Sequence, residues 1–142
     1  LAAENAIAAQ DLAKARQLTD LQSTQRPELL LAAQARLDSA HAGAVMQRLQ
    51  AWVIEHPLDA PAWQLLASAS TAAASPLRAL RAQAEVYAAQ MDYAKAADTL
   101  HAAQDWVRQG ARGGPVEHIE ASIIDARSRE IGLLAKEQLV EH

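Results

Sequence analysis

The sequence contains no cysteine and no phenylalanine, and only 4% of its residues are aromatic. Without cysteine the chain can form neither a disulfide framework nor a thiolate metal site. No apolar run approaches the roughly 20 residues that a helix needs to cross a bilayer, so we expect no membrane span. The net charge is −4, with acidic and basic residues interspersed. Because no basic patch stands out, we expect no nucleic-acid partner.

Alanine is the residue that takes the place of the missing aromatics. Hydrophobic residues make up 51% of the 142 positions, and alanine supplies much of that share. Alanine has the highest helix propensity and allows helices to pack at short distances, whereas the β-branched runs typical of sheets are missing. The composition therefore predicts an all-α fold. The length suits a single domain over residues 1–142.

The spacing of apolar residues, prolines and glycines predicts seven helices. A leading helix lies within residues 1–25, repeats occupy 26–110, and a long capping helix covers 116–140. Asp59 and Ser75 are expected to be N-cap residues, with proline in the first turn of the helices that follow. The six helices before the cap are expected at about 1–21, 28–38, 44–55, 60–73, 76–90 and 93–108. The last helix is expected to turn Ile119, Ile123, Ala126 and Ile131 inward.

A recurrence of 34 residues runs through the first half of the chain. Pro27, Leu29 and Ala33 recur as Pro61, Trp63 and Ala67. This period, with these residue types, is typical of tetratricopeptide repeats, in which helix pairs stack side by side. We therefore predict a short right-handed solenoid of antiparallel helix pairs. Residues after 76 fit a second frame, so irregular pairing is expected around 60–91, and Ser70 and Gln83 stand where the pattern prefers aromatics.

A search for catalytic or metal-binding motifs finds none that specifies chemistry. No histidine begins an HExxH helix, no glycine loop follows a strand, and no G-x-S-x-G turn is present. The run Glu117-His118-x-Glu120 has a superficial likeness to a metal site, but a solvated helix face is favoured because no second histidine stands at ligand spacing. We expect no catalytic residue, cofactor or metal in this chain.

Three other features leave alternatives open. Trp52 and Trp63 are expected in the core, while Trp106 suits the core and a binding surface equally. The loop at 110–114 is either a recognition loop or an ordinary connection. A group of arginines is either a carboxylate-binding strip or ordinary surface charge, and the second is favoured; these are Arg78, Arg81, Arg108, Arg112, Arg127 and Arg129.

The order of several fragments resembles a known family. They are Leu49-x-x-Trp52, His56-Pro57-x-Asp59-x-Pro61-Ala62-Trp63, Arg78-Ala79-x-x-Ala82-x-Ala84-Glu85-x-Tyr87, Asp92-Tyr93-x-x-Ala96 and His118-Ile119-Glu120-Ala121-x-Ile123. Together, over about residues 26–131, they resemble the C-terminal repeat region of BepA/YfgC-type periplasmic zinc metalloproteases of Gram-negative bacteria. The loop at 110–115 and the residues at Ser70 and Gln83 depart from that pattern, which leaves the shape of the groove open.

The resemblance implies a periplasmic location and a role in quality control or assembly of outer-membrane β-barrel proteins. The repeat domain would dock substrate or the assembly machinery, or fold back on its own protease domain. The catalytic zinc domain would precede Leu1, which suits a chain that begins without methionine, and no catalytic residue carries over to this sequence.

The leading hypothesis is therefore a non-catalytic protein-interaction domain. Its binding surface is expected to use four residues of the first helix of a pair: Arg36, Gln64, Arg81 and Gln83. One alternative is a self-assembling scaffold that pairs through a second apolar face of the last helix, formed by Leu133, Leu134, Leu139 and Val140. Others are a general repeat adaptor unrelated to a protease, and an enzyme in its own right, which would take up metal or carry a perturbed titrating group.

Overall fold

A computed structural model describes residues 2–110 and 115–141. Seven helices and no strands are found in these two ranges, which confirms the predicted all-α class. The helices are α1 (Ala2–Leu18), α2 (Arg26–Gln34), α3 (Ala42–Glu55), α4 (Ala60–Ala72), α5 (Pro76–Ala89), α6 (Tyr93–Arg108) and α7 (Pro115–Glu141).

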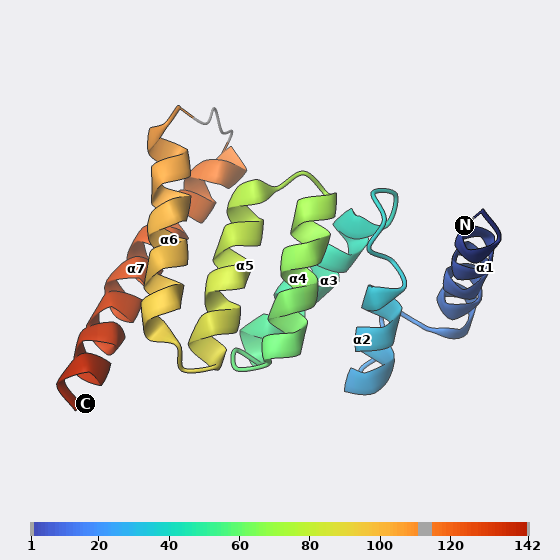
Figure 1. The fold of residues 1–142 in the computed structure, drawn as a ribbon, viewed down its shortest axis with the longest axis horizontal. Helices are drawn as coiled ribbons and strands as arrows, with labels where there is room; N and C mark the ends of the chain where they lie inside the picture. Colours follow the sequence, from blue (N-terminus) through green and yellow to red (C-terminus); the bar gives the residue numbers. More distant parts are fainter. Residues whose placement is uncertain (1, 111–114, 142) are drawn as a thin grey trace.

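The helices lie beside one another in chain order (Figure 1). From α3 to α6 the connections alternate between the two ends of the stack, so neighbouring helices run antiparallel. The most extensive packing joins α4 to α5, α5 to α6, α6 to α7 and α3 to α4, whereas α1 makes its main contact with α2 at one end of the molecule. The arrangement is solenoid-like, because α3 to α7 pack chiefly against their neighbours in sequence, while α2 packs against α1 and α4.

The 34-residue period is visible in the positions where helices begin. α2 begins at Arg26 and α4 at Ala60, while α3 begins at Ala42 and α5 at Pro76. Proline lies in the first turn of α2, α4 and α5, where a missing N–H costs no intrahelical hydrogen bond. The helix starts between residues 26 and 76 therefore follow one regular frame, and the pairing expected to be irregular around residues 60–91 stays a prediction. α6 begins at Tyr93, within one residue of the position that the period predicts, and the period is lost only at α7, which begins at Pro115.

The core consists of two clusters that share α5. The first cluster joins α2, α3 and α4 and includes Ala82 and Val86 of α5. The second joins α6 and α7 and includes Leu77, Ala84 and Ala88 of α5. Because α5 is buried on two sides, its small alanines allow both neighbours to approach closely. This one helix therefore connects the two halves of the molecule.

Both tryptophans that were assigned to the core are buried. Trp52 is 8% exposed and Trp63 is 4% exposed, and both belong to the first cluster. Trp106 is half-buried and packs against the second cluster. Ser70, which stands where an aromatic was preferred, is fully buried, and its hydroxyl forms no hydrogen bond.

The predicted inner face of α7 is wrong in part. Ile119 is 61% exposed and Ile123 is 36% exposed, whereas Ile124 and Ile131 are fully buried. Moving one residue along a helix turns the direction of the side chain by about 100°, so the face that packs on α6 includes Ile124 instead of Ile123. The prediction for Ile131 is confirmed, whereas Ala126 is only half-buried and is not a core residue.

The helix ends differ in how their backbone groups are satisfied. Asp59 caps α4, because its side chain accepts a hydrogen bond from the N–H of Ala62. Ser75 occupies the predicted N-cap position of α5, but its side chain makes no capping hydrogen bond. After the last turns of α4, α5 and α6, the chain takes a positive φ at Ala74 (57°), Met91 (63°) and Gly110 (88°). This is the left-handed residue that commonly follows a helix, and glycine suits it best.

Candidate functional site

A groove that combines polar and apolar side chains lies between α3, α5 and α7. Its volume is about 490 Å³. α3 and the α3–α4 loop contribute one wall, Ile123 of α7 contributes the other, and side chains of α4, α5 and α7 form the floor. The lining residues are Gln50, Val53, Ile54, Pro57, Leu58, Trp63, Leu66, Arg81, Glu85, Glu120, Ile123 and Arg127.

Ion pairs between α5 and α7 organise the floor of this groove. Arg127 of α7 donates three hydrogen bonds to the carboxylate of Glu85, at 2.8, 3.0 and 3.1 Å. Glu120 of α7 lies 3.3 Å from Nε of Arg78 and 3.5 Å from Nη1 of Arg81, both on α5. The two glutamates are buried, at 9% and 5% exposure, and a buried carboxylate needs such partners.

The contacts of Arg127 favour its charged form. Burial opposes the charged form of Arg127, but its hydrogen bonds and ion pairs with Glu85 and Glu130 outweigh burial and raise its pKa. The guanidinium of Arg81 lies over the ring of Trp63, with its carbon 5.8 Å from the ring centre. Nε of Arg81 and Oε2 of Glu120 are buried without a hydrogen bond, so these two residues are joined by an ion pair alone. The floor is therefore a set of paired charges beside a tryptophan, and it links α5 to α7.

The rim of the groove is apolar and accessible. Ile54 at the end of α3 is 80% exposed, Leu58 in the next loop is 78% exposed, and Ile123 on the opposite wall is 36% exposed. Covering such side chains removes apolar area from water, worth about 1.5–3 kcal/mol for a large side chain that becomes fully buried. The groove can thus bind a partner through its apolar rim over a rigid polar floor.

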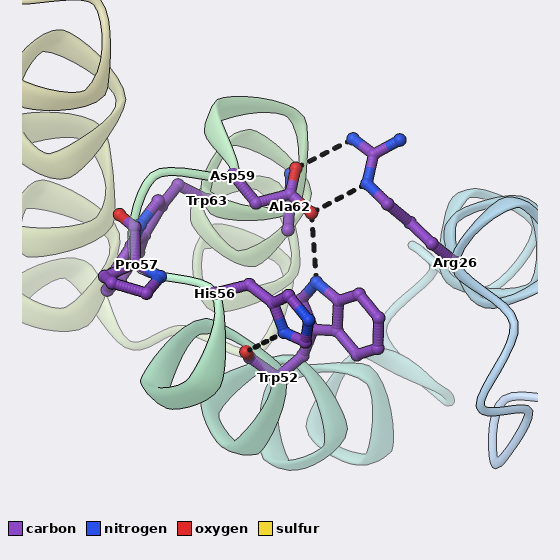
Figure 2. A network of polar contacts seen from close by, with 7 residues as sticks. All are labelled: Arg26, Trp52, His56, Pro57, Asp59, Ala62 and Trp63. Carbon is purple, nitrogen blue, oxygen red and sulfur yellow. Dashed lines mark hydrogen bonds and ion pairs between the residues drawn. The ribbon is translucent and has the colours of Figure 1, made fainter.

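The α3–α4 loop, which carries part of this rim, is held by a network around Asp59 (Figure 2). Arg26 donates two hydrogen bonds of 2.8 Å to the two carboxylate oxygens of Asp59. Trp52 donates its indole N–H to the same carboxylate at 3.0 Å. The indole N–H of Trp63 donates to the carbonyl of Pro57 at 2.8 Å. Two groove residues, Pro57 and Trp63, are thereby bound to each other.

The electrostatics of this network favour the ionised carboxylate. The hydrogen bond from Arg26, followed by those from Trp52 and Ala62, lowers the pKa of Asp59 to about 2. His56 stacks on Trp52 with ring centres 3.9 Å apart and also contacts the Trp52 carbonyl at 3.1 Å through Nδ1 (Figure 2). The run His56-Pro57-x-Asp59 thus forms a structural junction between α3 and α4. Through Asp59 it also binds Arg26, which lies at the start of α2, about one repeat earlier in the sequence.

The four residues predicted to bind a partner do not lie together. Arg81 lines the groove between α3, α5 and α7. Gln64 and Gln83 line a smaller groove of about 290 Å³ between α4 and α5. Arg36 lies after α2, and its side chain is engaged within the fold. It donates hydrogen bonds to the backbone carbonyls of Arg16, Thr19 and Ala32.

The arginine group divides in a similar way. Arg78, Arg81 and Arg127 pair with glutamates inside the fold, and Arg108 pairs with Asp105 of its own helix. Arg129 is exposed. Arg112 and most of the 110–114 loop lie outside the residues that the structure describes.

Several residues of the groove were missed by sequence reasoning. Ile54 and Leu58 are single apolar residues near a helix end, and no periodicity singles them out. Glu120 was expected on a solvated helix face, and Glu85 was noted only as part of the family resemblance. One signal could have found them. Glu85 and Arg127 are 42 residues apart, and Arg78 and Glu120 are separated by the same number, so the two oppositely charged pairs share one spacing.

In the described residues, no group of three or more histidines and acidic residues is suited to holding a metal ion. Of the run predicted to be a solvated face, Glu117 and His118 are exposed, while Glu120 is turned inward. None of the helices, over the ranges described, is long and apolar enough to cross a membrane. No known protein family matches the chain, and no curated protein matches it.

Proposed function

We propose that this chain is a non-catalytic helical-repeat domain that binds a protein segment in the groove between α3, α5 and α7. The observation that carries the proposal is the combination of an exposed apolar rim with a floor whose charges are already paired. A partner that covers Ile54 and Leu58 gains from burial, and it does not have to strip water from an unpaired charge.

The partner class follows from the sequence resemblance. Within a periplasmic zinc metalloprotease, the groove would dock unfolded outer-membrane β-barrel substrates or the machinery that assembles them. An extended or helical segment with apolar side chains at regular spacing fits such a groove. Zinc would belong to a catalytic domain elsewhere in the parent protein.

A photo-crosslinking experiment tests the groove. A photoreactive amino acid is placed at Leu58 in the groove, and in a matched variant at Leu31 of α2, which is also an exposed leucine (58%) but lies outside the groove. We expect crosslinks to outer-membrane assembly components or substrates from position 58 only. Equal crosslinking from both positions would contradict the groove as the binding site.

Affinity measurements on variants complete the test. Leu58→Asp and Ile54→Asp place a carboxylate on the rim, and each is expected to weaken binding of purified assembly components at least tenfold. Leu31→Asp is expected to leave the affinity unchanged. Because all three side chains are exposed, the variants should unfold at the same temperature as the parent chain.

The parent protein is tested separately. A metalloprotease origin predicts an HExxH motif in the coding sequence upstream of Leu1. If that motif is absent and the groove variants still lose binding, the chain is a repeat adaptor unrelated to a protease. The interaction function would then stand, and the protease assignment would fall.

A further inference from the structure

α7 carries a narrow apolar stripe on the side that faces away from the core. Ala126, Leu133 and Val140 recur every seven residues, and Leu133 and Val140 are 63% and 87% exposed. The buried residues Ile124 and Ile131 lie on the opposite side, since each residue of a helix turns the direction by about 100°. Leu134 is half-buried against the second core cluster, and Leu139 points to a different side of the helix from Leu133.

Charged residues flank this stripe with one sign on each side. Arg129 and Lys136 lie along one flank, and Glu130 and Glu137 lie along the other. All four are exposed. Within residues 2–110 and 115–141, Arg129, Lys136 and Glu137 form no ion pair, and Glu130 is bound only to Arg127 on its own helix.

The separation of charges determines which orientation of two such helices is favourable. In a parallel pair related by a two-fold axis, the acidic flank of one helix meets the basic flank of the other, on both sides of the seam. In an antiparallel pair, acid meets acid and base meets base. Only the parallel pair is complementary.

We propose that two copies of this chain associate in parallel and in register through α7. Leu133 packs against Leu133 of the second copy, and Ala126 and Val140 do likewise. Glu130 then faces Arg129 of the other chain, and Glu137 faces its Lys136. The stripe from Ala126 to Val140 spans about 21 Å, so the interface is at the small end of specific ones and the dimer is a weak one.

The association leaves the groove between α3, α5 and α7 free. Glu120 and Arg127, the α7 residues at its floor, lie about 120–140° around the helix from Leu133. Ile123, on its wall, lies about 80° from Leu133 and precedes the stretch from Ala126 to Val140. A dimer of this form presents two grooves, so a long unfolded partner can engage both, with a gain in avidity. This inference does not depend on the proposed function, because it concerns a different face.

Cysteine crosslinking tests the orientation, and the absence of native cysteine makes the readout clean. Ala126→Cys, Leu133→Cys and Val140→Cys are each expected to give a disulfide-linked dimer under mild oxidation. Leu139→Cys is the matched control, since it lies on α7 with 79% exposure but away from the stripe, and it should stay monomeric. An antiparallel pair would crosslink only through the residue at its centre, and that result would overturn the proposal.

Charge reversal with sedimentation equilibrium gives an independent test. Glu137→Lys and Lys136→Glu are each expected to raise the dissociation constant of the dimer about tenfold, because complementary contacts become repulsive. The double variant should restore it, and a mixture of the two single variants should form a heterodimer. A parent chain that remains monomeric at its highest soluble concentration, or a single variant that dimerises more tightly, would overturn the proposal.

Discussion

Asp59 performs three structural tasks with one side chain. It caps α4, binds Arg26 through both carboxylate oxygens and accepts the indole N–H of Trp52 (Figure 2). The ion pair with Arg26 requires the ionised form, and the hydrogen bonds from Trp52 and Ala62 favour it, which explains why its pKa falls from 3.8 to about 2. The stability that this carboxylate provides is therefore sensitive to acid.

The pH dependence has a definite sign. Because the pKa is lower in the folded chain than in the unfolded one, the stabilisation is fully present above about pH 5 and is lost as the pH falls towards 2. Asp59→Asn is expected to lower the free energy of unfolding at pH 7 by about 2 kcal/mol and to flatten its fall between pH 5 and 2. Urea unfolding at several pH values measures both effects. Asp98→Asn, at an exposed position, should reproduce the parent curve.

Ser70 offers a prediction of the opposite sign. Its buried hydroxyl forms no hydrogen bond in the described chain, and an unsatisfied polar group in the core is destabilising. Ser70→Ala removes that group and is expected to raise the free energy of unfolding by about 1 kcal/mol. Ser68→Ala on the exposed side of α4 is the control and should change little. A loss of stability in the Ser70 variant would show that the hydroxyl has a partner.

At the scale of elements, the relation between α5 and α7 depends on buried ion pairs. Arg127 binds Glu85 on α5 and Glu130 on α7, but Glu85 is 11% exposed and Glu130 is 64% exposed at the side chain. Glu85→Ala leaves a half-buried arginine without its main partner and is expected to cost about 3 kcal/mol of unfolding free energy. Glu130→Ala is expected to cost under about 0.5 kcal/mol. Chemical unfolding of the two variants compares them, and equal losses would contradict the assigned roles.

The backbone conformation after the end of α4 also affects stability. Ala74 follows α4 with φ of 57°, a conformation that strains a residue with a Cβ atom. Ala74→Gly is expected to raise the free energy of unfolding by about 0.5–1 kcal/mol. Ala51→Gly, at an exposed position inside α3, should lower it by about 1 kcal/mol. Thermal unfolding tests this, and a change of the same sign in both variants would refute the explanation.

At the scale of the whole molecule, stacking in chain order makes stability uneven. α1 lies at the end of the stack (Figure 1). It is held to the chain after α2 by Arg36, whose guanidinium binds the carbonyls of Arg16 and Thr19. A terminal helix with one neighbour opens more easily than one packed on both sides. α5, which belongs to both core clusters, is expected to open last.

Hydrogen exchange tests this order and the role of Arg36. In the parent chain, amide protection is expected to rise from α1 to α5. Arg36→Ala should increase exchange in α1 by at least tenfold and leave α5 to α7 unchanged, because few contacts connect these parts. If exchange in α1 did not change, Arg36 would be available for the binding role that its position in the sequence suggested.

Much of the fold could be predicted because its signals are local. Proline in the first turn of α2, α4 and α5, the 34-residue recurrence and the alanine-rich stripes are all legible within a few turns of the chain. The face of α7 could not be read in this way. Ile123 and Ile124 are equally apolar neighbours, and only packing against α6 decides that the second is buried and the first lies on the wall of the groove.

The sequence by itself determined that the chain is helical, where most helices begin, and that Trp52 and Trp63 are core residues, because propensity, capping and periodicity act over short distances. Only the tertiary structure decided which side chains meet. It turned Arg36 inward, separated Arg81 from Gln64 and Gln83, and brought Glu85 to Arg127. Pairing over such distances depends on how α5 and α7 pack, and that geometry is set by the sum of many weak contacts that no single motif records.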